Sequence, residues 1–475
     1  MSSYNPNDPL SIEAKGRELI NKSLISFYPH IAEVNDQNKG RFGLLVEAYH
    51  YGIVQNSISE PDFPKAGVEL KCSPLKADSK KELVPKERLV FSIINYEEII
   101  NEVFPESAFW KKNSLLMIIF YLFQNDEHSY EHLIKYAQLW RFPIKDLRII
   151  KEDWEFIVHK VKQGRAHELS EGDTFYLGAC TKGANAKSMR TQPFSNEMAK
   201  QRAFSLKPSY LKNVVSLFKA KANTFPLIDS EYKRILTEKT TIVGQDNGKY
   251  QAVSKSEYEP ILKDVNDIPY GKSFSNFILD TIQSHAGLSE EEIGNKYGVS
   301  INQSSKSKAY QVCKAIFGIK SKKIEEFEKA NLELKTIKLE STGALKESMS
   351  FANIDYKTIV DESWEDSYLF EVLSRKFLFV IFVKDEKKVA RLQKAMFWTM
   401  PEKDMVLAEA YWLDVKAKVI SKNFEGFYKL SDKKQFHVRP KSKNAADRYQ
   451  FDDGTTAPKK SYWLNASYIK QIISV

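Results

Sequence analysis

The alternation of hydrophobic and polar positions along the chain predicts both helices and strands. Between residues 40 and 53, Phe42, Leu45, Val46 and Tyr49 recur at helical spacing, which predicts an amphipathic helix. Short apolar runs predict strands at 68–73, 88–94 and 115–122, the last apolar throughout, and helical periodicity returns at 153–163. Helices interleaved with such strands predict a mixed α/β (α+β) fold in which a central sheet is flanked by helices.

Four sequence blocks occur twice, in the same order, at separations between 258 and 264 residues. Because the separation is nearly constant, we predict two tandem copies of one domain of about 200 residues. The paired blocks are 68–73 with 332–337, 87–96 with 347–356, 139–146 with 397–404, and 204–211 with 462–469.

The duplication sets the domain limits that we expect. Residues 1–219 form the N-terminal domain and residues 270–475 form the C-terminal domain. The stretch between them, 220–269, is polar and lacks a sustained apolar period, so we expect a linker or irregular connection there.

Composition narrows the class of protein. The chain has no run of about eighteen apolar residues and no secretory signal at its N-terminus, so we expect a cytoplasmic protein without a membrane partner. Its three cysteines form no CxxC pair, which argues against disulfides and structural zinc. The net charge of +9 is compatible with a polyanionic partner such as nucleic acid but does not require one.

Candidate chemistry is concentrated in one segment, Asp62-Phe-Pro-Lys-Ala-Gly-Val-Glu-Leu-Lys71. Side chains alternate along a strand, so Glu69 and Lys71 share one face, and a turn at Pro64–Gly67 can bring Asp62 back beside Glu69. Two neighbouring carboxylates repel each other unless a cation neutralises them, and hard oxygen ligands suit Mg²⁺. The segment therefore predicts a magnesium site at Asp62 and Glu69, with Lys71 beside the attacked phosphate or the attacking water. Glu47, on the preceding helix, is a further candidate ligand of the metal or of water.

Each part of this candidate site also has a purely structural interpretation. Glu-x-Lys pairs arise often in a chain with 28% charged residues, and most mark a solvated strand edge. Glu47 taken alone is more typical of a surface position on a helix. The segment gains specificity from the motifs that surround it.

Those motifs are Gly43-Leu-Leu-Val-Glu47, the segment Asp62–Lys71, Glu87-Arg-Leu-Val90, Cys180-Thr-Lys-Gly-Ala-Asn185 and Arg202-Ala-Phe-Ser-Leu-Lys207. In this order they resemble the MutH-type branch of the restriction-endonuclease-like nucleases. Two such domains in tandem resemble the type II restriction endonucleases that cut at GATC, and this resemblance covers nearly the whole chain. It implies a Mg²⁺-dependent double-strand cut at 5′-GATC-3′, on the 5′ side of the G. The catalytic set that it implies is Glu47, Asp62, Glu69 and Lys71.

The resemblance also assigns a loop that reads DNA bases. Thr181, Lys182 and Gly183 match the family's base-reading loop in the major groove. Lys182 can donate to guanine O6 or N7, and Gly183 lets the backbone approach the base edges. Without the resemblance, the loop would be interpreted as a plain surface turn.

Three positions farther along complete the DNA-binding residues that we expect. Arg202 and Lys207 are either phosphate contacts or solvated side chains. Ser205 stands where the mismatch-repair relatives carry a tyrosine that helps to sense adenine methylation. This departure leaves open which methylation, adenine or cytosine, blocks cleavage.

The second copy has lost part of the catalytic set. Its residues opposite Glu47, Asp62, Glu69 and Lys71 are Lys314, Glu326, Glu333 and Lys335. A lysine near the site would repel a metal ion, and the Pro-x-x-Gly turn is absent. We therefore expect the second copy to be catalytically silent.

The second copy has kept a good match to the DNA-reading loop, Phe436-His-Val-Arg-Pro-Lys441. Arg439 and Lys441 suit contacts to guanine or phosphate. The hypothesis is that this copy binds a second GATC site as an allosteric effector and promotes cleavage by the first copy, with looping when both sites lie on one DNA. The alternative is a purely structural partner domain.

Three functions are compared. The first is a type II restriction endonuclease that acts on double-stranded DNA, alongside a cognate DNA methyltransferase, as a monomer or a DNA-induced dimer. The second, a strand-nicking mismatch-repair endonuclease, needs only one domain. The third, a non-cleaving GATC-binding regulatory protein, has no use for the intact set of Asp62, Glu69 and Lys71.

Overall fold

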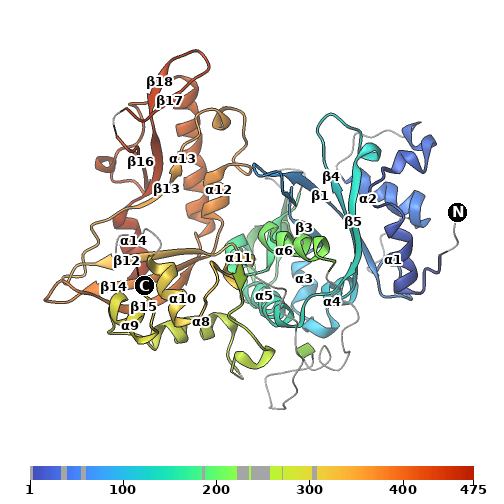
Figure 1. Ribbon diagram of the computed structural model, residues 1–475, viewed down its shortest axis with the longest axis horizontal. Helices are drawn as coiled ribbons and strands as arrows, with labels where there is room; N and C mark the ends of the chain where they lie inside the picture. Colours follow the sequence, from blue (N-terminus) through green and yellow to red (C-terminus); the bar gives the residue numbers. More distant parts are fainter. Residues whose placement is uncertain are drawn as a thin grey trace. The chain divides into compact units, whose positions relative to one another are not determined.

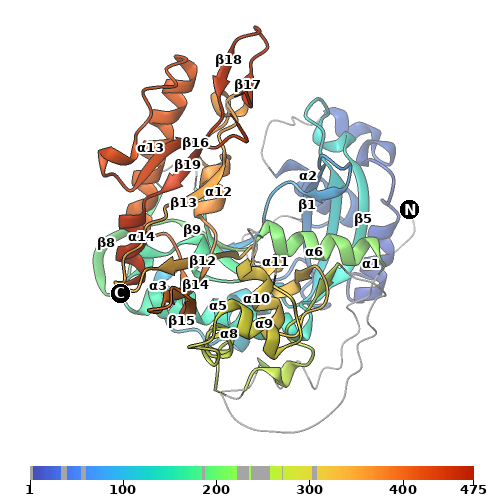
Figure 2. The same ribbon diagram turned by 60° about the vertical axis from the view of Figure 1, so that its left-hand side comes forward.

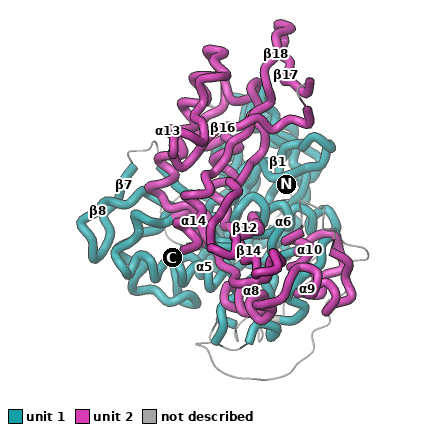
Figure 3. Tube along the Cα trace, turned by 90° about the vertical axis from the view of Figure 1, so that its left-hand side faces the viewer, with its two compact units in different colours: residues 1–169, 174–274, 325–331 teal, residues 170–173, 275–324, 332–475 magenta. Residues whose placement is uncertain are grey.

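The computed structural model describes residues 4–33, 40–54, 60–183, 188–221, 235–236, 257–269, 271–301, 308–444 and 446–474. The chain divides into two compact units (Figure 3). Unit 1 comprises residues 1–169, 174–274 and 325–331, and unit 2 comprises residues 170–173, 275–324 and 332–475. Most of the predicted connection, 220–269, lies outside the described residues.

Unit 1 contains most of the first repeat. Its strands are β1 (Glu69–Ala77), β2 (Leu83–Pro85), β3 (Leu89–Ile93), β4 (Leu116–Leu122), β5 (Leu133–Trp140), β6 (Leu177–Thr181), β7 (Met189–Gln192), β8 (Ser195–Lys200), β9 (Arg202–Leu206) and β10 (Tyr258–Glu259). Its α-helices are α1 (Pro9–Arg17), α2 (Arg41–Leu45), α3 (Tyr96–Ile99), α4 (Ala108–Asn113), α5 (Ile144–Lys162), α6 (Pro208–Lys219) and α11 (Glu325–Lys329). A π-helix, Val46–Tyr51, continues α2, and 3₁₀ helices lie at Leu24–Ser26, Pro29–Glu33, Phe104–Glu106, Ser129–Glu131, Ala166–Glu168 and Val265–Asp267.

The central sheet of unit 1 has the strand order β2-β1-β4-β5. β4 pairs in parallel with β1 and antiparallel with β5, and its first five residues are buried. Helices α1 and α2 pack against this sheet (Figures 1 and 2). A second sheet has the order β3-β9-β6, and β7 and β8 form a separate hairpin.

Unit 2 repeats this architecture. Its strands are β11 (Lys323–Ile324), β12 (Glu333–Leu339), β13 (Met349–Asn353), β14 (Phe377–Lys384), β15 (Ala390–Trp398), β16 (Phe436–Pro440), β17 (Arg448–Gln450), β18 (Thr456–Pro458) and β19 (Lys460–Leu464). Its helices are α8 (Phe274–Gln283), which begins at the unit boundary, α9 (Glu290–Lys296), α10 (Lys308–Ile316), α12 (Tyr368–Leu373), α13 (Glu402–Ile420) and α14 (Ala466–Ile473), with 3₁₀ helices at Glu171–Asp173, Thr358–Val360 and Leu430–Asp432.

Apart from β2, which has no counterpart in the described sheet of unit 2, the two main sheets of the units correspond strand by strand. In unit 2 the order is β12-β14-β15, with β12 parallel and β15 antiparallel to β14, as β1, β4 and β5 are in unit 1. The second sheet, β13-β19-β16, likewise matches β3-β9-β6. The predicted mixed α/β class and the duplication are therefore confirmed.

Two short segments lie in the unit of the other repeat. α11 belongs to the second repeat but packs in unit 1, where Lys329 Nζ donates to both carboxylate oxygens of Asp146 at 2.9 Å. Conversely, residues 170–173 of the first repeat belong to unit 2, where Thr399 donates to the carbonyl of Gly172 at 2.8 Å. No pattern in the sequence predicts this exchange.

Several predicted elements differ at their ends. The predicted helix at 153–163 starts earlier, at Ile144, because Pro143 occupies the position before the first turn, where its missing N–H costs nothing. The predicted strand at 68–73 extends to Ala77, because β2 pairs with its end. Among the described residues, no helix combines the length and the apolar character needed to cross a membrane.

Candidate active site

A tight hairpin brings Asp62 beside Glu69, as the sequence predicts. Phe63 and Val68 form an antiparallel bridge, and the turn between them closes at Gly67, whose φ of +64° favours glycine. The Leu70 N–H then donates to Asp62 Oδ2 at 2.9 Å, and the Asp62 N–H donates to Glu69 Oε2 at 3.1 Å. The two carboxylates are thus fixed by the backbone of the hairpin and of β1.

Two lysines approach Glu69 from different elements. Lys71, on the same face of β1, places Nζ 2.5 Å from Glu69 Oε1. Lys112, near the end of α4, places Nζ 3.7 Å from the same oxygen. Sequence reasoning missed Lys112, because nothing in its local pattern marks it. It comes near Glu69 because α4 leads into β4, and β4 pairs with β1.

Glu47 reaches this site from the π-helix. The backbone after Glu47 differs from the same stretch of the second copy. In the first copy the Ile53 N–H donates to the Glu47 carbonyl, and in the second copy the Ile319 N–H donates to the Lys314 carbonyl. The first copy holds one more residue between these partners than the second, where α10 is a regular α-helix. A π-helix is such a one-residue insertion and is frequent at functional sites. The predicted helix is therefore present, but its second half turns Glu47 differently from a regular helix.

Glu47, Asp62, Glu69 and Lys112 line one cavity of about 760 Å³. Burial, together with the nearby Asp62, raises the pKa of Glu47 to about 7. Burial also raises the pKa of Glu69, and Lys71 and Lys112 offset this only in part. The cavity is lined by four carboxylates, from Glu47, Glu60, Asp62 and Glu69, and by two lysines, Lys65 and Lys112. This excess of carboxylates favours binding of a further cation.

The residues present fit a magnesium ion that takes part of its shell from substrate and water. Among the residues that the structure describes, no three His, Cys, Asp or Glu side chains form a ready metal cluster. Mg²⁺ is usually bound by one or two carboxylates together with phosphate oxygens and water. Asp62 and Glu69 supply such a pair of carboxylates, and Glu47 lines the same cavity.

The predicted base-reading loop follows β6. Thr181 ends this strand, and Thr181, Lys182 and Gly183 are all exposed. The Lys182 N–H donates to the Gln201 carbonyl at 2.8 Å, which fixes the base of the loop. Ala184 and Asn185, the end of the matched motif, lie outside the described residues.

The other predicted DNA contacts of the first copy point inward. Arg202 is 2% exposed and donates to the Ala179 carbonyl at 2.8 Å, and Ser205 is 1% exposed. Lys207 is half-buried and donates to the Thr174 carbonyl. In this conformation Arg202 and Ser205 cannot touch phosphate, because other side chains cover them. They support β9, which pairs with β6 and so holds the loop.

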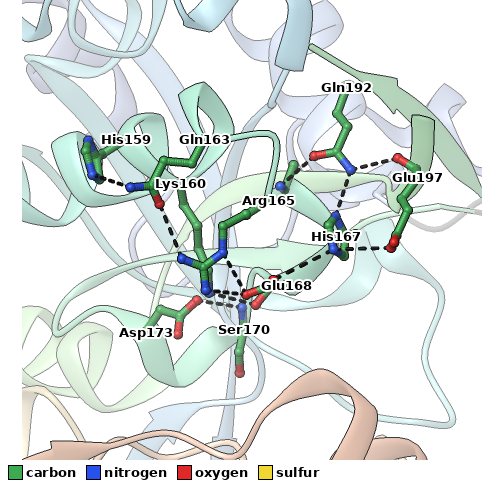
Figure 4. A network of polar contacts seen from close by, with 11 residues as sticks. His159, Lys160, Gln163, Arg165, His167, Glu168, Ser170, Asp173, Gln192 and Glu197 are labelled. Carbon is green, nitrogen blue, oxygen red and sulfur yellow. Dashed lines mark hydrogen bonds and ion pairs between the residues drawn. The ribbon is translucent and has the colours of Figure 1, made fainter. Parts of the chain in front are cut away.

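A polar network anchors the β7–β8 hairpin that follows the loop (Figure 4). The side-chain amide of Gln192 donates to His167 Nδ1 at 2.9 Å and to the Glu197 carbonyl at 2.7 Å. Gln192 Oε1 accepts from the Ala166 N–H, and His167 Nε2 lies 3.2 Å from Glu197 Oε2. His167 thus has a structural role here.

The second copy does not assemble the same site. Glu326, opposite Asp62, lies in unit 1 and accepts the N–H groups of Ile261 and Leu262 at 2.8 and 2.9 Å. Glu333, opposite Glu69, lies in unit 2 and pairs with Lys335 at 2.8 Å and with Arg375 at 2.7 Å.

The charge balance of the second copy is also different. Burial raises the pKa of Glu333, but Lys335 and Arg375 outweigh it and hold this pKa below its usual value. Glu69 also has two cations nearby, but it has the carboxylate of Asp62 beside it as well, whereas the groups that shift the pKa of Glu333 are burial and two cations. Glu333 therefore retains less negative charge for a metal ion. Both findings support the prediction of a silent second copy.

The matched DNA-reading strand of the second copy is β16. Arg439 is exposed, and its guanidinium lies 4.4 Å from the centre of the Trp463 ring. Lys441 is half-buried and donates to Ser350 Oγ at 3.1 Å. Of the two, Arg439 is the better placed to meet a ligand from solvent.

Comparison with known proteins found relatives of this chain. Residues 51–153 and 317–409 match the family of the DNA mismatch repair enzyme MutH. The chain is 32% identical over 492 residues to the type II restriction enzyme Sau3AI of Staphylococcus aureus, covering 96% of this chain and 92% of that protein. It is 28% identical over 184 residues to the DNA mismatch repair protein MutH of Shewanella woodyi, covering 38% of this chain and 77% of that protein.

The fold and the site define a site-specific deoxyribonuclease built from two MutH-like copies. The chain belongs to the family of type II restriction endonucleases that includes Sau3AI. Its substrate is DNA, and nucleases of this structural class generally use divalent metal ions.

Proposed function

We propose that this protein cuts both strands of DNA at 5′-GATC-3′, on the 5′ side of the G, with Mg²⁺ as its cofactor. The observation that carries the proposal is that hydrogen bonds join Asp62, Glu69 and Lys71, and that Asp62 and Glu69 line one cavity. The relative Sau3AI, a type II restriction enzyme aligned over nearly the whole chain, supports the same class of reaction.

Each residue of the candidate site is given a separate role at the phosphate. Asp62 and Glu69 bind the metal ion, and Glu47 binds it or a water molecule from the π-helix. Once bound, the ion supplies charge stabilisation at the phosphate and a more acidic water. The Leu70 N–H keeps Asp62 in place, and Lys71 Nζ, held beside Glu69, orients the attacking water or neutralises the phosphate.

Sequence specificity is assigned to the loop after β6. Lys182 donates to guanine in the major groove, and Thr181 and Gly183 bring the backbone near the base edges. The loop is supported by the strands below it. We assign the role of holding β9 and β6 in register to Arg202, Ser205 and Lys207. Each wrong base in the site is expected to cost about 1–3 kcal/mol, and affinity falls steeply with added salt.

The second copy is assigned an effector role. Arg439 and Lys441 would bind a second GATC site, with DNA looping when both sites lie on one molecule. The neutralised Glu333 supports binding without cleavage. The protein would act in the cytoplasm beside a cognate DNA methyltransferase, as a monomer or as a DNA-induced dimer.

One digestion experiment separates the three candidate functions. Plasmids with one or two GATC sites, unmethylated or methylated on adenine or cytosine, are incubated with the protein and Mg²⁺. Discrete double-strand fragments support the proposal. Nicked circles alone indicate a strand-nicking repair enzyme, and intact plasmid that is nevertheless bound indicates a regulatory protein.

A further inference from the structure

The helix α13 is a nineteen-residue element of unit 2 (Figure 1). Its apolar side chains lie on two faces, one buried and one exposed. One face belongs to the core of unit 2 and includes Ala408, Trp412, Val415 and Val419. Packing of this face into the core holds α13 in unit 2.

The opposite face carries a continuous apolar stripe. It consists of Val406, Ala410, Leu413, Ala417 and Ile420, all exposed. Val406, Leu413 and Ile420 are 55%, 51% and 59% exposed, respectively. Single exposed hydrophobic residues are ordinary, but a stripe of five along one helix marks an interaction surface.

The spacing within the stripe is that of a coiled-coil seam. The five positions follow each other at intervals of 4, 3, 4 and 3 residues. This is the alternation with which two helices pack side by side along a shared seam. The large residues occupy one class of seam position, and the two alanines occupy the other.

The first copy provides an internal control. In α5, the helix equivalent to α13, the same five positions hold Arg148, Glu152, Glu155, His159 and Lys162. Every one of them is polar or charged. The stripe is therefore not required by the shared fold, because the same helix forms in unit 1 without it.

We propose that α13 is a self-association helix that pairs, antiparallel, with α13 of a second copy of this chain. In that orientation Ala410 faces Leu413 of the second copy, and Ala417 faces Val406, so each small side chain meets a large one. A two-fold axis repeats both contacts, which gives a closed dimer.

Charge favours the antiparallel over the parallel orientation. In the antiparallel pair, Glu409 of one helix flanks the seam opposite Lys416 of the other, and the two-fold axis makes this contact twice. In a parallel pair, Glu409 would instead lie near Asp414 of the other helix. Asp414 is already paired with Lys418 of its own helix at 2.6 Å, so the parallel form gives Glu409 no attraction to replace the contact with Lys416. Alanine would also face alanine, which disfavours the parallel form.

The pairing depends on the proposed function in one respect: the stripe on α13 would be the surface through which the DNA-induced dimer forms. A helix pair of this length buries less than the roughly 1,200 Å² of a stable interface, so the free protein should pair weakly. Two copies held on one DNA have a high local concentration, which strengthens a weak contact without any new one.

The first test measures mass against concentration. Sedimentation of the full chain, free and with GATC-containing DNA, should show a reversible shift from one copy towards two. A variant with the first copy's residues (Val406→Arg, Ala410→Glu, Leu413→Glu, Ala417→His, Ile420→Lys) should stay a single copy under conditions where the wild type pairs. Leu430→Glu, at a residue 52% exposed elsewhere in unit 2, is the matched control and should pair normally.

The second test reads the orientation. Chains with Ala410→Cys are mixed with chains with Leu413→Cys and oxidised. The antiparallel register predicts mixed disulfide dimers, whereas a parallel register predicts dimers within each variant. The wild type, with Cys180 and Cys313 buried and Cys72 partly buried, sets the background.

Three outcomes overturn the proposal. They are a wild type that remains one copy even on DNA, a stripe variant that pairs as well as wild type, and cross-links within each variant only. A single-copy wild type whose stripe variant also loses thermal stability would assign the stripe to contacts within the chain. Cleavage by a wild type that stays a single copy on DNA would overturn the pairing alone, and pairing without cleavage would overturn the proposed nuclease function alone.

Discussion

Glu69 and Glu333 occupy the same position in the two copies, but their surroundings shift the pKa of the two carboxyl groups in opposite directions. At Glu69, burial and Asp62 outweigh Lys71 and Lys112, so the pKa is raised. At Glu333, Lys335 and Arg375 prevail over burial, so the pKa is lowered. Two cations lie near each glutamate, but Asp62 adds a second negative charge beside Glu69 that a further cation can neutralise.

Removing the charge of Lys71 should abolish cleavage while binding remains. Lys71→Met keeps most of the side-chain stem but loses the ammonium, so we expect cleavage to fall by about 100-fold or more. Filter binding with Ca²⁺ in place of Mg²⁺ should show unchanged affinity for a GATC duplex. Lys65→Met, at a lysine that lines the neighbouring cavity, is the control. Loss of binding together with cleavage would indicate a structural role for Lys71.

Glu326 should make stability depend on pH. Burial raises its pKa to about 7, although two backbone N–H groups favour the charged form. At pH values between the ordinary glutamate pKa of 4.5 and the raised pKa of about 7, the unfolded chain releases the proton and the folded chain keeps it. The stability from this group is therefore complete below 4.5 and is lost as pH rises to 7, by up to about 3 kcal/mol.

Thermal unfolding measured from pH 4.5 to 7.5 checks this expectation. The fall in Tm over that range should be smaller in Glu326→Gln, which cannot ionise, than in the wild type. Equal slopes in the two proteins would show that Glu326 titrates normally.

At the scale of elements, the π-helix Val46–Tyr51 distinguishes the first copy from the second. Both copies enter this region with a helix and leave it at a similar turn, Gly52–Ile53 or Gly318–Ile319. The additional residue of the first copy lies between the start of the helix and the turn at Gly52–Ile53. One residue corresponds to a rotation of about 100° around a helix, which is enough to turn Glu47 to or from the cavity.

Deleting Ala48 should convert the π-helix into a regular α-helix and so inactivate the site. We expect cleavage to fall by about 100-fold while circular dichroism and GATC binding stay close to wild type. Ala48→Ser, at the same exposed position without a change in length, should retain activity. A deletion variant that still cuts DNA would show that the π-helix does not position Glu47.

At the scale of the whole molecule, the polypeptide passes between the units more often than a simple tandem repeat requires. Residues 170–173, just before β6, belong to unit 2, and α11, just before β12, belongs to unit 1. The strand that leads into the base-reading loop is therefore tethered by contacts that unit 2 makes to Gly172. This connectivity offers a covalent route by which an effector site could influence the loop.

If β16 of the second copy binds a second GATC site, removing its basic side chains should abolish the faster cleavage expected for a plasmid with two sites. For Arg439→Ala combined with Lys441→Ala, the cleavage rate of a two-site plasmid should fall about tenfold, to that of a one-site plasmid. Lys357→Ala, at an exposed lysine of the same unit, should keep the advantage. If the double variant cuts both plasmids like wild type, the effector role is wrong.

Much of the fold followed from pattern and duplication. Period-two alternation predicted that Val68 and Leu70 enter the core opposite the face of Glu69 and Lys71, and the run at 115–122 predicted the central strand. The Pro-x-x-Gly turn predicted that Asp62 folds back beside Glu69. Lys112 and Arg375 could not be predicted, because they meet the glutamates only through parallel pairing of distant strands.

The sequence by itself determined the local geometry of this protein: two copies of one α/β topology, and an aspartate, a glutamate and a lysine joined across one hairpin. Such features depend on residues close together in the chain, whose periodicity and turn chemistry act locally. Only the tertiary structure decided that Arg202 and Ser205 are buried, that Glu326 caps backbone N–H groups in unit 1, and that Lys112 joins the cavity. These outcomes depend on which distant segments pack together, and burial and charge balance follow from that packing.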